Sequence, residues 1–343
     1  MKDIAVRAGV SQATVSHALR GTGRLADDTR ATIRKLAEEM GFREDPMMGA
    51  LAAYRNRRED ARRTVENIAF LYAAEPAYNP ENARDLQALR AGIVDGAERW
   101  GFHVETLAHE GGEESCRRLT RILRNRGVRG VILYFARPSE KLAPRELDWD
   151  KFAVVACRPI FSRQLFHSVS TDHFANGRIL YAKLRALGYR RIGFGFSEAL
   201  DLVTNRAFKA GVWAEEQAIC PPGERIEPLI MATWEQNLFD AWFRKWTPEA
   251  LITQNWRIYF WLKALGKHVP TDVGVAVPYS TDSSEFYSGM NPRFRLMGSE
   301  AVRLLREQII LGNYGPPEFP FTIHIPSNWH GGQSLAPLSK TKG

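Results

Sequence analysis

The chain has 343 residues, of which 44% are hydrophobic and 25% are charged, so it has the composition of a globular protein and the length for two or three domains. It contains no apolar run near the roughly 20 residues that span a bilayer and no apolar stretch of the kind found in signal peptides, so we expect a cytoplasmic protein without a membrane partner. The net charge is +8, and thirteen Lys and Arg against nine Asp and Glu in residues 1–63 give that stretch a net charge of +4, which predicts phosphate binding there.

The N-terminal residues predict three short helices around a small core. The helices are expected at Lys2–Ala8, Ser11–Arg20 and Asp28–Met40, with Gly9 in the turn between the first two. Within each helix, apolar residues recur at helical spacing, as at Ile4 and Ala8, Val15 and Ala18, and Ile33 and Ala37, and these faces would meet in the core. Two helices joined by a glycine turn and closed by a third are typical of a helix-turn-helix head that binds duplex DNA.

The residues of this head resemble those of the LacI/GalR family of bacterial transcriptional regulators. The resemblance rests on Lys2–Ala5, Ala8–Ser11, Ala13–Ser16 and Thr29-Arg30. It implies that the second helix enters the major groove of an operator. The implied base-reading residues are Gln12, Ala13 and His17, and the implied phosphate contacts are Ser11, Thr14, Ser16 and Arg20. The chain begins without the residues that normally cap the first helix, which predicts a frayed start or a start codon upstream.

The segment 46–64 is predicted to be a hinge helix and linker. Asp45 and Pro46 suit an N-cap and a first helical position. The resemblance implies that Leu51 wedges into the minor groove at the centre of the operator. Met48-Gly49 stand where the family usually has Ala-Arg, so we expect one minor-groove contact to be either absent or supplied by Arg55.

From Glu66 onward, strand patterns alternate with helical patterns, which predicts parallel sheets covered by helices on both faces. The expected strands are Asn67–Tyr72, His103–Leu107, Gly130–Phe135, Ala153–Cys157, Arg191–Phe196, Glu227–Met231, Ala250–Thr253, Val273–Val277 and Phe321–Ile325. The expected helices are Asp85–Trp100, Glu114–Asn125, Asn176–Leu187, Arg206–Gln217, Trp234–Trp246, Ile258–Leu265 and Pro292–Gly312. This part resembles the periplasmic-binding-protein-like core of the same family (type I).

The fold class is therefore expected to be an all-α helix-turn-helix head plus an α/β core of two doubly wound parallel-sheet lobes. We expect the head at 1–45, the first lobe at 65–165 with 291–320, the second lobe at 166–290 with 321–331, and a tail at 332–343. The tail has no heptad repeat, which favours a homodimer on a near-palindromic operator over a coiled-coil tetramer.

An effector is expected beyond the carboxyl ends of the strands, where ligands of such sheets bind. Aromatic side chains there would stack on sugar faces, and charged or amide groups would hold hydroxyls. The candidates for contact with a small molecule such as a carbohydrate are Tyr78, Arg137, Asp172, Phe174, Asn205, Arg206, Trp256 and Tyr279. Phe208 replaces an arginine that the family usually has, and Pro278-Tyr279 and Trp256 also depart from its pattern. These changes favour a larger or more apolar effector, or none at all.

Two other function classes compete with the transcriptional regulator. A solute-binding sensor with weakened DNA binding is favoured by Met48-Gly49 and by the uncapped first helix. An enzyme would need a glycine-rich phosphate loop or a nucleophile with its base, and neither pattern occurs. Cys116, Cys157 and Cys220 lack metal-ligand spacing, so we predict buried reduced thiols, no metal and no cofactor.

Overall fold

The computed structural model describes residues 2–20, 26–42, 66–73, 83–134, 147–158, 164–280 and 285–338. The chain divides into two compact units, Met1–Thr64 and Val65–Gly343, and each has its own core. The predicted hinge residues Leu51 and Arg55 and the predicted effector residues Tyr78 and Arg137 lie outside the described residues.

The N-terminal unit contains the three expected helices, α1 (Lys2–Ala8), α2 (Gln12–Arg20) and α3 (Asp27–Glu39). Their apolar faces enclose one small core, whose buried members are Ile4, Ala5, Val15, Ala18, Ile33 and Ala37. Gly9, between α1 and α2, has φ +66°, a left-handed conformation that a β-branched residue would adopt only with strain. The predicted helix-turn-helix head is confirmed.

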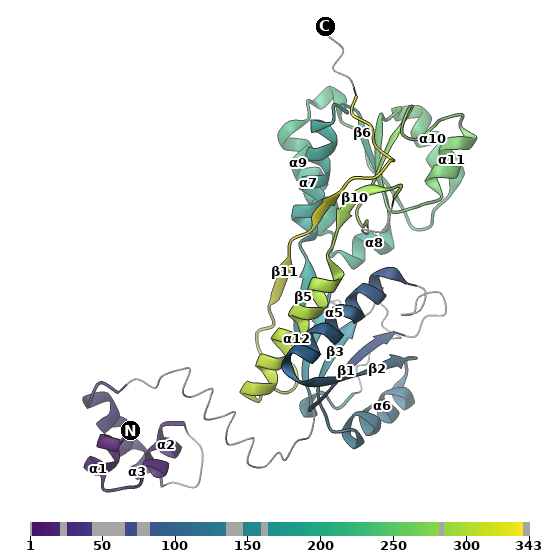
Figure 1. Cartoon of the computed structure of the whole chain (residues 1–343). Coiled ribbons are helices and arrows are strands. Elements are labelled where there is room, and N and C mark those ends of the chain that lie inside the picture. The colour runs from purple at the N-terminus through teal and green to yellow at the C-terminus, as the bar shows by residue number, and fades with distance from the viewer. Residues whose placement is uncertain are drawn as a thin grey trace. The chain divides into compact units, whose positions relative to one another are not determined.

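Among the described residues, the first lobe of the larger unit is a six-stranded parallel sheet with helices on both faces (Figure 1). Its strands are β1 (Glu66–Ala73), β2 (Phe102–His109), β3 (Val128–Tyr134), β4 (Ala153–Cys157), β5 (His167–Thr171) and β11 (Thr322–Ile325), in the order β11-β5-β4-β3-β1-β2. Its helices are α5 (Arg84–Trp100), α6 (Glu113–Asn125), the short η1 (Trp149–Lys151) and α12 (Phe294–Leu311). Successive side chains of a strand point to opposite faces, so Ile68 and Phe70 of β1 pack with α5 and α12, whereas Ala69 and Leu71 pack with α6.

The second lobe also has six strands in the described part of the chain, and they are parallel except for the edge strand β12, which is antiparallel to β10. Its strands are β6 (Ile192–Ser197), β7 (Leu229–Met231), β8 (Ala250–Thr253), β9 (Gly274–Val277), β10 (Ser288–Asn291) and β12 (Asn328–His330), in the order β12-β10-β9-β8-β6-β7. Its helices are α7 (His173–Ala186), α8 (Glu198–Val203), α9 (Ala207–Ile219), the short η2 (Pro222–Glu224), α10 (Gln236–Trp246) and α11 (Ile258–Ala264). Helices α7 and α9 pack on one face, and α10 and α11 pack on the other.

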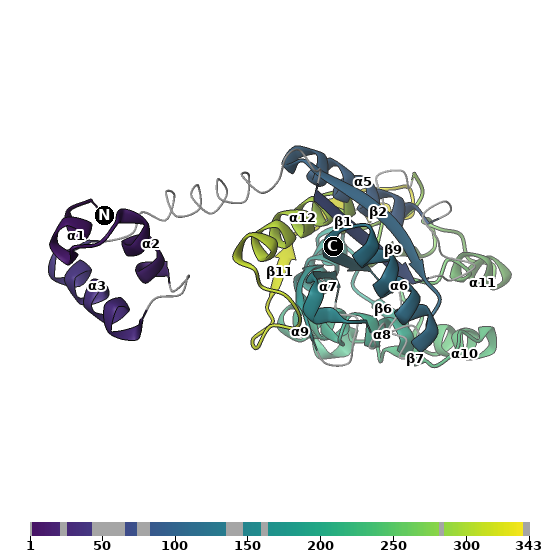
Figure 2. The same cartoon turned by 90° about the horizontal axis from the view of Figure 1, so that it is seen from below.

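The chain passes between the lobes after β5, after β10 and after β11, because these strands precede elements of the other lobe. Helix α12 returns to the first lobe as predicted and lies beside α5 in both views (Figures 1 and 2). The two-lobed α/β core is therefore confirmed. No helix among the described residues is long and apolar enough to cross a lipid bilayer.

The structure differs from the sequence analysis in several elements. The sequence analysis did not predict strands β5, β10 and β12 or helix α8. Strands β5 and β10 are rich in polar residues, β12 has only three residues, and α8 has only six. Strands β5 and β11 pair with each other in the first sheet, so the assignment of 166–171 and 321–325 to the second lobe is wrong. Helix α7 begins at His173 rather than at Asn176, because the Asp172 carboxylate accepts a hydrogen bond from the Ala175 amide and caps it.

A pair of helices in each lobe crosses at glycines with no space for a side chain. In the second lobe, a Cβ at Gly211 of α9 would overlap the Phe174 carbonyl oxygen of α7, and a Cβ at Gly177 would overlap the Phe208 oxygen. In the first lobe, a Cβ at Gly92 of α5 would overlap the Arg295 carbonyl oxygen of α12, and a Cβ at Gly298 of α12 would overlap the Leu89 carbonyl oxygen of α5. These four glycines let the two helix backbones of each pair touch.

Glu216 of α9 is a buried carboxyl whose Oε1 has no hydrogen-bond partner among the described residues. Burial raises its pKa, and the Arg225 charge only partly offsets that effect. A raised folded pKa means that the carboxyl binds its proton more tightly in the folded state. The wild-type free energy of unfolding therefore falls as pH rises from the ordinary carboxyl range through the raised pKa.

We expect Glu216→Gln to raise the free energy of unfolding by about 1 kcal/mol at pH 8, because the amide removes a buried charge. At pH 4 the difference should shrink, since Glu216 is then protonated when folded. Urea unfolding at both pH values measures this, with exposed Glu227→Gln as the control. An equal gain at pH 4 and pH 8 would contradict the assignment.

Candidate DNA-binding and effector sites

The start of α2 is fixed by a local hydrogen bond. The Ser11 Oγ accepts from the Thr14 amide at 3.1 Å and lies 2.9 Å from Thr14 Oγ1. Val15 and Ala18 are buried on the inner side of the helix, whereas Gln12 is exposed on its first turn. The early residues of α2 are therefore held on a packed helix with Gln12 facing solvent, as direct reading of base edges requires.

The other predicted DNA contacts remain predictions. Ala13, Ser16, His17 and Arg20 belong to α2, but their side chains lie outside the described part of the structure. Ser11 acts as the N-cap of α2, and whether its hydroxyl also meets a phosphate stays a prediction.

Four side chains meet where the two lobes join, and we call them the junction cluster: Tyr134, Arg158, His173 and Tyr279. Tyr134 ends β3 and Arg158 follows β4 in the first lobe, whereas His173 begins α7 and Tyr279 follows β9 in the second. The Arg158 Cζ lies 5.3 Å from the centre of the Tyr134 ring and 5.8 Å from that of Tyr279. Arg158 thus contacts aromatic rings of both lobes.

The backbone of Arg158 is itself unusual. Its φ is +86°, a left-handed conformation that costs a non-glycine residue of order 1 kcal/mol, and its amide donates to the Val169 carbonyl of β5 at 3.0 Å. The residue is 8% exposed, so Arg158 combines a buried side chain with an unfavourable backbone conformation. Such positions concentrate at functional sites.

The junction cluster holds His173 in its neutral form. Burial first, and then the positive charges of Arg158 and His324, lower the pKa of His173 to about 3. Burial also raises the pKa of Tyr279, so its hydroxyl keeps its proton. We therefore assign the Tyr279 hydroxyl as the donor to His173 Nδ1 at 3.3 Å, which places the imidazole proton on Nε2. Nε2 has no hydrogen-bond partner among the described atoms and offers a ligand one donor.

The structure brings only some of the predicted effector residues together. Tyr279 belongs to the junction cluster, and Asp172 adjoins it, with one oxygen capping α7 and the other 3.9 Å from His324 Nδ1. Phe174 is 42% exposed on α7, and Trp256 is 60% exposed beside Phe260. Within the described ranges, no hydrogen bond, ion pair or ring contact links Phe174, Trp256, Asn205 or Arg206 to the cluster; the last two form an exposed left-handed turn before α9.

Sequence reasoning did not select Tyr134, Arg158 or His173 as effector residues. A charged residue directly after the fully buried strand Ala153–Cys157 was the signal for Arg158. Phe208, which stands where the family has an arginine, is buried and packs edge-on against Phe196 at 5.4 Å, so it belongs to the core. Cys157 is buried, and burial raises the pKa of its thiol to about 12, as expected for an unreactive cysteine.

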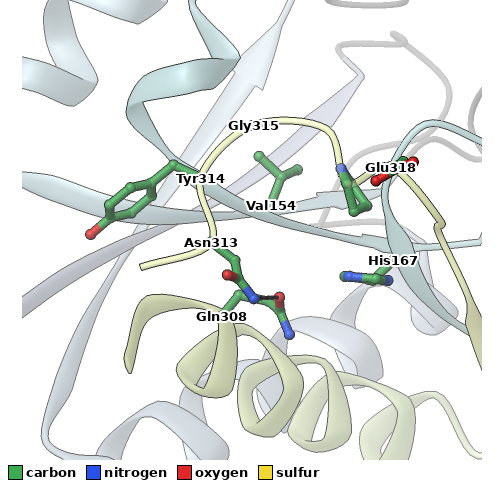
Figure 3. Close-up of a pocket in the computed structure, with 8 residues that line it drawn as sticks. Val154, His167, Gln308, Asn313, Tyr314, Gly315 and Glu318 are labelled. Carbon is green, nitrogen blue, oxygen red and sulfur yellow. Dashed lines mark hydrogen bonds between the residues drawn. The ribbon is translucent and has the colours of Figure 1, made fainter. Parts of the chain in front are cut away.

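A separate cavity of about 290 Å³ lies at the amino ends of the strands of the first sheet, whereas the junction cluster lies at their carboxyl ends (Figure 3). His167 and Val154 line it from the amino ends of β5 and β4, and the Gln308 side chain accepts from the Asn313 amide at 3.0 Å in its wall. The wall also includes Tyr314, whose hydroxyl accepts from Arg129, and Arg129 pairs with Glu66 at 2.7 Å. No predicted effector residue lines this cavity.

Two family models match the chain, one in each unit. Residues 1–45 match the bacterial regulatory proteins of the lacI family, and residues 181–335 match a periplasmic binding protein-like domain. The curated regulator KdgR of Bacillus subtilis is 22% identical over 95% of this chain and 94% of its own length. The maltose regulon regulatory protein MalI of Escherichia coli is 28% identical over 56% of this chain and 52% of its own length. These relatives are regulators of transcription.

Solved structures share the fold of the whole chain. A complex of the transcriptional regulator CelR with cellobiose has a TM-score of 0.61 and 20% identity, over 96% of this chain and 98% of that one. A lac repressor dimer bound to operator and the anti-inducer ONPF has a TM-score of 0.58 and 18% identity, over 97% and 98%. Together, the head, the two lobes and these matches show that the chain is a DNA-binding regulator of transcription whose head belongs to the LacI family of bacterial regulatory proteins.

Proposed function

We propose that the chain is a repressor that binds a near-palindromic operator as a homodimer and changes its operator affinity when a carbohydrate-like molecule binds at the junction cluster. The observation that carries the proposal is the packed head, in which α2 is capped by Ser11 and presents Gln12 to solvent. DNA binding places its site of action in the cytoplasm, and the proposal includes no catalytic activity.

The head would read DNA with its second helix. Gln12 has the donor and acceptor needed for bidentate bonds to an adenine edge, Ala13 suits a thymine methyl, and His17 suits a guanine acceptor. Two heads in a symmetric dimer would read two half-sites, so the operator would be near-palindromic. The lac repressor structure bound to operator supports this arrangement.

The junction cluster would sense the effector. It combines a cation between two rings, a neutral imidazole with a free donor and the Asp172 carboxylate beside it, which suits a hydroxyl-rich ligand with one apolar face. Because the cluster takes residues from both lobes, a ligand there would favour one lobe orientation. It would change operator affinity only by its preference between the two orientations. The cellobiose complex of CelR supports a sugar as the class of ligand.

A two-variant experiment tests both halves of the proposal. After selection of the preferred duplex from a random library, Gln12→Ala should weaken binding by about 1–3 kcal/mol and relax the preference at one base pair of each half-site. Arg158→Gln should keep wild-type operator binding but lose its response to a panel of mono- and disaccharides. Gel shifts at two salt concentrations measure both effects.

Three results would contradict the proposal. Uniform weakening of all sequences by Gln12→Ala would place this residue on phosphate. Failure of the wild type to select any duplex at low salt would favour a solute-binding sensor with weakened DNA binding. Turnover of any sugar in the panel would indicate an enzyme.

A further inference from the structure

A second cavity, of about 400 Å³, lies against the segments that join the two lobes. Asp95 and Arg99 of α5 and Arg295, Leu296 and Ser299 of α12 line it from the first lobe, Asn291 and Asn328 line it from the second sheet, and Arg293 lines it from the connection before α12. Asn291 and Asn328 are register neighbours on β10 and β12, beside two of the three passages between the lobes. None of these residues belongs to the junction cluster or to the head.

The lining of this cavity carries a clear excess of positive charge. Arg99, Arg293 and Arg295 contribute three charges, and Asp95 is the single acidic residue among the lining residues. Asp95 Oδ2 holds Arg295 through Nε and Nη2, both at 2.7 Å, which orients that guanidinium and leaves its Nη1 available. Neither Arg99 nor Arg293 forms an ion pair within the described residues. The lining residues thus carry a net charge of +2, which suits one doubly charged anion.

The local fold fixes these arginines with respect to one another. The crossing at Gly92 puts the α5 backbone against the Arg295 carbonyl, so α5 and α12 cannot separate without losing that contact. Arg293 has φ 58° and ψ 50°, and the Asn291 Oδ1 accepts from its amide at 2.9 Å. The arginines from α12 and its preceding turn are therefore held beside α5 by backbone contacts.

We propose that this cavity binds a phosphate group, either free or carried by a small metabolite. Guanidinium groups bind phosphate oxygens through paired, charge-assisted hydrogen bonds, and the three that line this cavity match a doubly charged anion in charge. Because the site includes residues of α5 and α12 together with Asn291 and Asn328 of the second sheet, bound phosphate would link the two lobes. It would then act on their relative orientation independently of the junction cluster.

Isothermal titration of the full chain with inorganic phosphate, and separately with glycerol 3-phosphate, tests this proposal. Sodium chloride at matched ionic strength serves as the reference for screening. We expect saturable binding of at least one phosphate compound, weakened about tenfold or more by Arg293→Gln or Arg99→Gln. Arg303→Gln is the matched control, because Arg303 is also on α12 but pairs with Glu300 and does not line the cavity.

The outcomes separate the two sources of phosphate and also decide whether the cavity binds phosphate at all. Tighter binding of glycerol 3-phosphate would assign the site to a phosphomonoester, and tighter binding of inorganic phosphate would assign it to the free ion. Arg293→Gly, which suits the left-handed backbone, keeps the test valid should the glutamine variant fold poorly. Heat that sodium chloride reproduces, or unchanged affinity in the folded Arg293 and Arg99 variants, would overturn the proposal.

Discussion

Gly211→Ala is expected to lower the free energy of unfolding by about 3 kcal/mol, because its Cβ would overlap the Phe174 carbonyl oxygen. Both atoms belong to helix backbones, so no rotamer change relieves the overlap, and α7 and α9 must move apart. The apolar contacts of Phe208 and Val212 in the same core would be lost with that movement. For a chain of this size we expect the melting temperature to fall by roughly 6–12 °C.

Gly223→Ala provides the matched control for this effect. A Cβ at Gly223 meets no atom within 4 Å, and its φ is not left-handed. The same substitution there should leave the free energy of unfolding unchanged or raise it by about 0.5 kcal/mol, because alanine lowers the conformational entropy of the unfolded chain. Calorimetry of the two variants gives the comparison, and equal melting temperatures would refute the helix-crossing argument.

Val15→Asp is expected to abolish specific DNA binding while leaving the lobes folded. Val15 is fully buried in the head, and a carboxylate there would have no compensating partner in this apolar core. A core of so few side chains does not tolerate that cost. We expect operator affinity to fall by about 1,000-fold, to the level of non-specific binding.

The control for this variant lies on the neighbouring helix. Val6 of α1 is 75% exposed, so Val6→Asp adds the same charge without burying it and should keep the head folded. Fluorescence anisotropy with the selected duplex measures affinity, and thermal unfolding of each variant monitors the lobes. Wild-type affinity in Val15→Asp, or a lower melting temperature of the lobes, would contradict the independence of the two units.

The head was predictable because its determinants are local. Apolar residues at helical spacing, such as Val15 and Ala18 or Ile33 and Ala37, give each helix one apolar face, and these faces form the core without any knowledge of distant segments. The alternating strands and helices of the lobes were predictable for the same reason. Strand β5 was not predicted, because four of its five residues are polar and a polar segment does not indicate a fully buried strand. Its Ser168 Oγ lies 2.8 Å from Thr322 Oγ1 of β11, a partner that periodicity along the chain does not show.

The effector site was only partly predictable, since it forms between strand ends that are distant in sequence. Tyr279 could be proposed because it follows a strand, and Asp172 because it precedes a helix. The role of Arg158 depends on rings more than twenty residues before it and more than a hundred after it, and on a left-handed backbone. Nothing in the neighbouring residues indicates these contacts.

The glycine crossings also determine how each lobe deforms. Where two helix backbones touch, there is no interface of side chains that could reorganise, so the pair moves as one rigid body. A displacement of the first turn of α7, next to Asp172, is therefore carried through α9 to the far end of the second lobe. The flexibility that the molecule needs is left to the three short connections between its rigid halves.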